Sequence, residues 1–127
     1  ESIDFNGNTG PFIQYTHARI KSILRKSSVV PSIKETVELS PKEIRLVKLL
    51  SAYPQKVAEA AAAYSPALIA NFAYDLAKEF NQYYHETPIL KEPDADVLQM
   101  RLALVSVLAS VLCKSMGILG IQLPDRM

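Results

Sequence analysis

Apolar residues recur at intervals of three and four along most of this chain, a pattern that predicts an all-α protein. The pattern is clearest after Ser65-Pro66, where a capping residue and a proline mark a helix start. The apolar positions that follow are Ile69, Phe72, Ala73, Leu76, Phe80 and Tyr83. This spacing places them on one face of a helix, so we expect a long amphipathic helix packed against a core.

Four or five helices account for nearly the whole chain. The first begins near Pro11, and the second begins at Ser40, where Ser40 and Glu43 can form a capping box around Pro41. We expect Ile44, Val47 and Leu50 or Ser51 of this second helix to face inward. The connection between the two helices, residues 28–39, shows no sustained period.

Two further helices follow from composition. The alanine-rich segment 55–63 predicts a short helix with close neighbours, because alanine lets backbones approach. Residues 97–116 are apolar nearly all round, so this last helix is expected at the centre of the bundle, capped by Asp94 or Asp96. No segment predicts a β-strand.

Composition places the chain among globular proteins of one domain. It has 127 residues, of which 49% are hydrophobic and 21% charged. A single cysteine, Cys113, excludes an internal disulfide and suits a reducing cytosol. The charge-free run inside the last expected helix, residues 102–113, is shorter than the roughly 20 residues that span a bilayer. The first five residues resemble no signal peptide.

Catalytic material is scarce. The two histidines, His17 and His85, belong to no nucleophile or metal motif, and residues 6–10 lack the lysine that follows the glycines of a phosphate loop. Asp94 and Asp96 are better explained as helix caps than as a metal pair. We therefore expect no catalytic residue and no metal site in this chain.

Binding material is richer, although a net charge of +1 does not itself indicate a nucleic-acid protein. No acidic residue lies between Gln14 and Lys34, so the first helix is locally basic. Phe12 and Tyr15, three apart, are expected on about the same side of it. Rings beside cations can stack on unpaired bases, at about 1–3 kcal/mol each, but spacing alone favours a core role.

Four segments together resemble the arginyl-tRNA synthetase family. Residues 7–19 read Gly-Asn-Thr-Gly-Pro-Phe-Ile-Gln-Tyr-Thr-His-Ala-Arg, similar to the family's Gly-Asn-Thr-Gly-Pro-Tyr-Leu-Gln-Tyr-Ala-His-Ala-Arg. Residues 76–84 resemble its Leu-Ala-x-x-Phe-Asn-x-Phe-Tyr segment, and residues 101–104 resemble the signature region of its DALR anticodon-binding domain. Residues 117–127 resemble its Leu-Leu-Gly-Ile and Pro-Glu-Arg-Met close.

The resemblance implies an all-α bundle of about five helices, of the class I aminoacyl-tRNA synthetase anticodon-binding type, with residues 1–127 as one domain. It implies a ligand, the anticodon loop and stem of tRNA-Arg. It also implies a parent enzyme, monomeric, cytoplasmic and not membrane-bound, that joins arginine to its tRNA with ATP and magnesium. The parent's two ATP-handling motifs are absent here, so its catalytic domain is expected as a partner, and this chain is expected not to catalyse.

The tRNA-binding residues that the resemblance implies are Phe12, Gln14, Tyr15, His17, Arg19, Tyr84 and Met127. Phe12 replaces the family's usual tyrosine, which preserves stacking but removes the hydroxyl's hydrogen bond. Two alternatives are a helical module that recruits a protein through an apolar groove, and the DALR domain of a related enzyme such as a cysteinyl-tRNA synthetase. The specific match over residues 7–19 argues against both.

Overall fold

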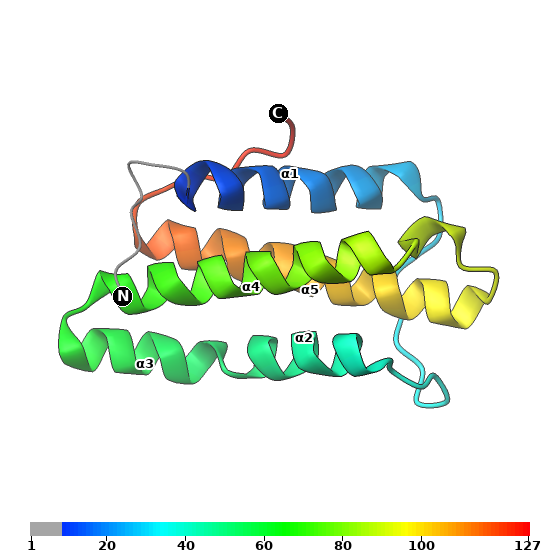
Figure 1. Cartoon of the computed structure of the whole chain (residues 1–127), viewed down its shortest axis with the longest axis horizontal. Coiled ribbons are helices and arrows are strands. Elements are labelled where there is room, and N and C mark those ends of the chain that lie inside the picture. Colours follow the sequence, from blue (N-terminus) through cyan, green and yellow to red (C-terminus); the bar gives the residue numbers. More distant parts are fainter. Residues whose placement is uncertain (1–8) are drawn as a thin grey trace.

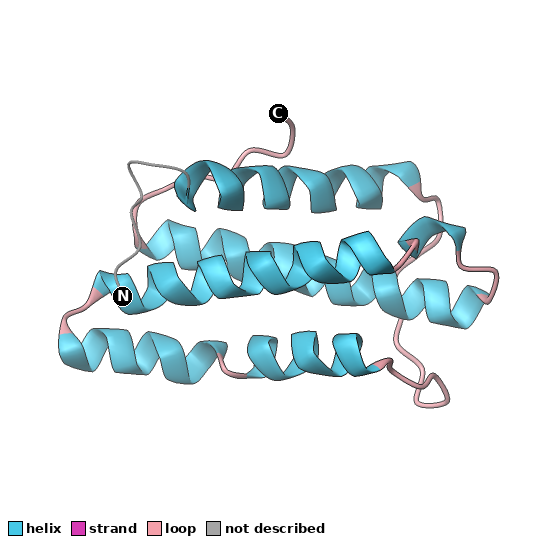
Figure 2. Ribbon diagram, viewed as in Figure 1, coloured by secondary structure: helices cyan, strands magenta, loops and turns pink. Residues whose placement is uncertain are grey.

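A computed structural model describes residues 9–127 of the chain, and within that range every regular element is a helix (Figure 2). Gly7 and Asn8, which open the family-like motif, lie outside the described residues. The elements are α1 (Thr9–Lys26), α2 (Pro41–Ser51), α3 (Tyr53–Ala63), α4 (Pro66–Glu86), a 3-10 helix η1 (Ile89–Lys91) and α5 (Ala95–Ile118). The predicted all-α bundle of about five helices is confirmed.

The helices form three layers. α4 and α5 pack against each other in the middle, α1 covers both from one side, and α2 with α3 lies along the other (Figure 1). All six apolar positions predicted for α4 are buried. α5 buries ten residues between its neighbours, as its composition predicts. The core therefore lies along α4 and α5, and α1 keeps one face exposed.

Local sequence signals explain where the helices begin. Ser40 accepts a hydrogen bond from the Glu43 amide, and the Glu43 side chain accepts one from the Ser40 amide, so the predicted capping box is present. Asp94 caps α5 by accepting hydrogen bonds from the amides of Asp96 and Val97. Ser65 occupies the capping position of α4, but its side chain makes no hydrogen bond to the first turn.

The prediction for the inward face of α2 is wrong for Ile44 and Val47, although Leu50 is half-buried against the core. Glu43 and Leu46 are the buried residues of this helix, whereas Ile44 and Val47 are 41% and 37% exposed. The helix turns this face inward because Glu43 finds polar partners on α4 and α5, described below. Helical periodicity predicts burial from apolar residues alone, so it favoured Ile44 and Val47 over Glu43 for the buried face.

Two other expectations change in detail. Among the alanines of α3 only Ala60 is buried, but α3 packs closely along α4, so the predicted close approach is made to one neighbouring helix. α5 also extends two residues beyond the predicted range 97–116 at each end. Within residues 9–127 it is the one helix long and apolar enough to cross a membrane by length and composition, and it is also a core helix of this bundle.

Candidate nucleic-acid interface

The exposed face of α1 concentrates positive charge. The helix contains Arg19, Lys21, Arg25 and Lys26 and no acidic residue. The ion pairs within residues 9–127 instead use Lys34, Lys42, Arg45, Lys56 and Arg101. The positive charge of α1 therefore has no carboxylate partner in the described part of the chain, although the whole chain is nearly neutral.

A hollow of about 500 Å³ lies between α1 and the C-terminal tail. We call it the tail hollow, and it is lined by Tyr15, Ala18, Arg19, Ser22, Arg25, Arg126 and Met127. Its α1 residues recur every three or four positions from Tyr15 to Arg25, with Ala18 and Arg19 adjacent, so successive turns present them on one face. The side chains of Tyr15 and Met127 are 62% and 64% exposed, which leaves an aromatic ring and a thioether open to a ligand.

Two hydrogen bonds hold the tail across α1 (red segment beside the blue helix, Figure 1). The ring Nδ1–H of His17 donates to the Pro124 carbonyl oxygen at 2.8 Å, since that oxygen can only accept. The Arg25 guanidinium donates to the Asp125 carbonyl oxygen at 3.0 Å. His17 is 3% exposed, so its observed contact is with the tail and its effect is to bring Met127 to the hollow.

Arg19 is held between α1 and α4. Its guanidinium donates a hydrogen bond to Asn81 Oδ1 and lies 4.5 Å from the ring centroid of Tyr84. Asn81 is itself fixed, because its amide donates to Thr16 Oγ1 and to the Ala77 carbonyl, each at 2.8 Å. Arg19 has five N–H donors, of which one is used here, so the others remain for a phosphate or a base.

The structure separates Phe12 from Tyr15, against the expectation that both rings share one side. Phe12 is half-buried and packs against the core, with its ring centroid 5.6 Å from that of Tyr74 on α4. Gln14 is also half-buried and lies outside the residues that line the tail hollow. Among the predicted site residues, Tyr15, Arg19 and Met127 therefore share the hollow, and Tyr84 adjoins it through Arg19.

Four residues of this region escaped the sequence reasoning: Ser22, Arg25, Asn81 and Arg126. Ser22 and Arg25 continue the helical spacing that starts at Tyr15, so the period could have identified them. Asn81 and Arg126 lie inside two of the family-like segments, but nothing in their spacing indicates that one positions Arg19 and the other faces α1.

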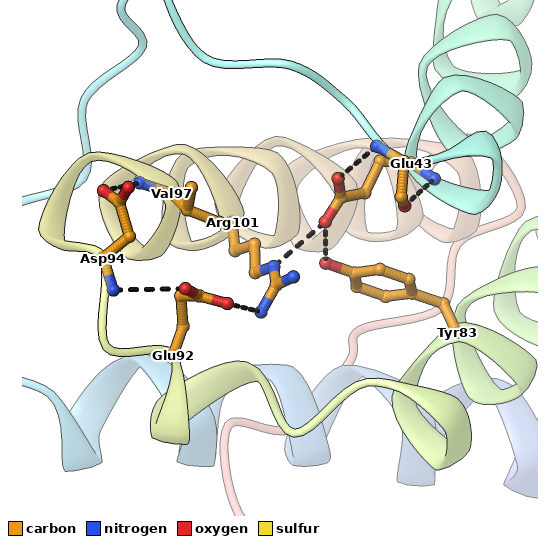
Figure 3. Close-up of polar contacts among 7 residues, drawn as sticks. Glu43, Tyr83, Glu92, Asp94, Val97 and Arg101 are labelled. Carbon is orange, nitrogen blue, oxygen red and sulfur yellow. Dashed lines mark hydrogen bonds and ion pairs between the residues drawn. The ribbon is translucent and has the colours of Figure 1, made fainter.

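A second group of charged residues lies inside the bundle, and we call Glu43, Tyr83, Glu92 and Arg101 the Glu43 network (Figure 3). Glu43 Oε2 accepts hydrogen bonds from the Tyr83 hydroxyl at 2.7 Å and from Arg101 Nε at 3.0 Å. Arg101 Nη1 lies 3.0 Å from Glu92 Oε1. The arginine of the DALR-like segment thus contacts two carboxylates of the protein, an arrangement that periodicity did not reveal.

The network shifts two pKa values in opposite directions. Burial acts to raise the pKa of Glu43, but hydrogen bonds from the Ser40 amide, the Tyr83 hydroxyl and Arg101 outweigh it and hold this pKa below its ordinary value. Burial, and next the hydrogen bond to Glu43, raise the pKa of Tyr83 far above that of a free phenol. Glu43 therefore stays ionised and Tyr83 stays a donor near neutral pH.

An apolar hollow of about 490 Å³ lies between α2, α5 and the connection that joins α1 to α2. Its lining includes Ile33, Val47 and Val107, which are 72%, 37% and 48% exposed. No charged residue lines it. This is the kind of groove that the protein-interaction alternative requires, so the structure offers that alternative a surface as well.

Comparison with known proteins distinguishes the RNA-binding interpretation from the protein-interaction alternative. Residues 13–127 match the family described as DALR anticodon binding domain. The whole chain aligns with the arginine–tRNA ligases of Bacteroides fragilis and Porphyromonas gingivalis at 51% and 50% identity, and it spans 22% of the length of each. The solved arginyl-tRNA synthetase of Thermus thermophilus superposes with a TM-score of 0.87 at 35% identity, over 98% of this chain and 22% of that one. With the family match extending over nearly all described residues, the chain belongs to the DALR anticodon binding domain family.

Proposed function

We propose that this chain is the anticodon-binding domain of an arginyl-tRNA synthetase and that it binds the anticodon loop and stem of tRNA-Arg. The observation that carries the proposal is the tail hollow, where an exposed tyrosine, three arginines and the tail methionine meet beside a helix without acidic residues. The family description and the names of the relatives supply the class of ligand.

Each residue of the proposed site has a role that its position supports. Tyr15 stacks on an unpaired base, because its ring is exposed and lines the hollow. Arg19, Arg25 and Arg126 neutralise phosphates, and the fixed guanidinium of Arg19 orients one of them. Met127 contacts a base through its adaptable side chain.

The remaining predicted residues support that surface. Tyr84 holds Arg19 by the face of its ring, and His17 holds the tail. Phe12 braces the first turns of α1 against Tyr74, so its difference from the family's tyrosine falls at a packing contact. Gln14 lies on the same turn of α1 as Phe12. It contacts the RNA only if the anticodon loop extends past Tyr15 toward the start of α1.

The names of the relatives support a proposal for the parent activity. We propose that residues 1–127 form one domain of a longer, monomeric, cytoplasmic enzyme without a membrane attachment. Its catalytic domain joins arginine to tRNA-Arg with ATP and magnesium, and this chain contributes binding and no catalysis. The alternative, a protein-interaction module built on the apolar hollow, is less well supported because the family match and the cationic hollow both favour RNA.

The test is a titration of the 127-residue chain with tRNA-Arg and with a tRNA of different anticodon, at 50 and 200 mM salt. We expect tighter binding to tRNA-Arg and a steep salt dependence. Three neutralised phosphates in a single-stranded loop give a slope of log K against log salt of about −2. Equal affinity for the two tRNAs together with a flat salt dependence would contradict the proposal.

A further inference from the structure

A hollow of about 380 Å³ lies where α3 ends, α4 begins and α5 ends, at the left end of the bundle in Figure 1. We call it the end hollow, and its lining includes Val57, Tyr64, Pro66, Ile69, Ile118 and Leu119. None of residues 9–127 that line it is charged, in contrast to the tail hollow with its three arginines. Tyr64 and Ile118 are 94% and 53% exposed, so a large ring and an aliphatic side chain meet water side by side. Exposed apolar groups gathered in this way mark an interface.

Tyr64 stands at a backbone position that is unfavourable for a tyrosine. It ends α3 in the left-handed conformation, with a φ of 50°, and its amide and that of Ser65 donate to carbonyl oxygens of the last turn of α3. Glycine or asparagine usually occupies such a position, because a Cβ there approaches the following carbonyl oxygen. Within residues 9–127, Tyr64 is the only residue other than glycine with a positive φ. Its exposed ring gains no packing in return, unless a further surface covers the ring. An unfavourable backbone with no local compensation points to a function for the side chain.

The end hollow lies beside the point where the rest of the proposed parent joins this domain. The chain spans 22% of the length of its arginine–tRNA ligase relatives, and residues 117–127 resemble the close of that family's sequences, so the rest of the proposed parent precedes residue 1. α1 begins at the same end of the bundle as the end hollow (Figure 1), and eight residues precede Thr9. The apolar hollow, by contrast, lies toward the end where α5 begins. Of the two uncharged hollows, the end hollow is therefore the one placed to meet the preceding part of the parent.

We propose that the end hollow is the surface by which this domain docks against the preceding part of its own parent chain. An apolar surface of that part covers the ring of Tyr64 and the side chain of Ile118. The docked surface is apolar because the lining offers no charge to pair with an acidic or basic one. This inference rests on the proposed function, in which the chain is one domain of a longer enzyme. It adds the contact that holds the RNA-binding face of α1 in a fixed position relative to the rest of that enzyme.

The experiment measures the exposure of the Tyr64 side chain by hydroxyl-radical footprinting with mass spectrometry. It is applied to the full-length parent and to the 127-residue chain, both without RNA. We expect Tyr64 to be modified roughly fivefold more slowly in the parent, because the core of a docked interface excludes water. Tyr15, which is 62% exposed and lines the tail hollow, is the internal reference and should react equally in both proteins.

Two variants on α5 form a matched pair. Ile118→Glu places a carboxylate in the end hollow, and Val107→Glu places one in the apolar hollow at a side chain of similar exposure, 48%. In the parent, we expect Ile118→Glu to return the modification rate of Tyr64 to that of the 127-residue chain, since an unpaired carboxylate opposes burial. Val107→Glu should keep Tyr64 protected. In the 127-residue chain, both variants should keep the wild-type helicity by circular dichroism and the wild-type affinity for tRNA-Arg.

Each contrary outcome has its own reading. Equal modification of Tyr64 in the parent and in the 127-residue chain would overturn the docking surface. Loss of protection in Val107→Glu as well would indicate a general loosening of the domain and would also overturn it. Protection of Tyr64 in the 127-residue chain that increases with protein concentration would assign the hollow to a second copy of the chain, against the proposal. The footprints contain no RNA, so a failure to bind tRNA-Arg would overturn the proposed function without changing them.

Discussion

The Glu43 network and the tail hollow both gather charged residues, but they differ in what satisfies those residues. In the Glu43 network the arginine meets two carboxylates, and it is mostly buried. In the tail hollow the arginines are held by neutral groups, an amide oxygen for Arg19 and a carbonyl oxygen for Arg25. Neutral partners fix an arginine in place without cancelling its charge. The first arrangement therefore stabilises the fold, and the second leaves charge for a ligand.

The largest expected effect is a loss of stability on breaking the Glu43 network. Glu43→Ala removes the acceptor of Ser40, Tyr83 and Arg101 and leaves Arg101 partly unpaired, so we expect the free energy of unfolding to fall by about 3–5 kcal/mol. Urea denaturation followed by circular dichroism measures it. The control is Glu59→Ala, which breaks the exposed pair with Lys56 and costs about 0.5 kcal/mol. Similar losses in the two variants would contradict a structural role for the network.

A smaller effect, on RNA affinity and not on stability, is expected from a substitution in the tail hollow. Tyr15→Ala removes an exposed ring, so affinity for the anticodon stem-loop should fall by about 1–3 kcal/mol, the range for one stacked base. Stability should change by less than about 0.5 kcal/mol. Fluorescence anisotropy with labelled RNA gives the affinity. Tyr64→Ala, which removes a 94% exposed tyrosine from the end of α3, should leave it unchanged. Unaltered affinity of Tyr15→Ala would rule out base stacking there.

The smallest expected effect is on how stability depends on pH in the acid range. Because the folded-state pKa of Glu43 lies below its ordinary value of 4.5, its ionised form stabilises the fold above that pH. This contribution is lost as pH falls below about 4.5 and through the folded-state pKa. Glu43→Gln cannot titrate, so its unfolding midpoint in urea should decline less steeply than that of the wild type between pH 5 and 3. Parallel acid profiles would show that other carboxylates account for the acid loss.

Much of the fold could be predicted from local signals. The inward stripe of α4 and the caps of α2 and α5 depend on residues a few positions apart, and the structure confirms them. The inward face of α2 could not be predicted this way. Glu43 is buried because Tyr83 and Arg101 reach it from 40 and 58 residues away, and no local pattern carries that information.

In the candidate site, too, some features follow from local sequence and others depend on residues far apart in the chain. Helical spacing places Tyr15, Arg19 and Arg25 on one side of α1, and it could have separated Tyr15 from Phe12 had α4 been known to lie beside Phe12. The approach of Met127 depends on the contact between His17 and Pro124, which are 107 residues apart. Only the family resemblance linked the two ends of the chain before the structure did.

The carboxylate of Glu43 has one further consequence, for the cooperativity of unfolding. One of its oxygens closes the first turn of α2, and the other binds α4 and α5 through Tyr83 and Arg101. A helix whose own start depends on the same side chain as its docking cannot detach intact. Opening of α2 therefore coincides with disruption of the core, and the amides of Glu43 and Ile44, which donate to Ser40, should exchange hydrogen with solvent only at the rate of the most protected amides in the molecule.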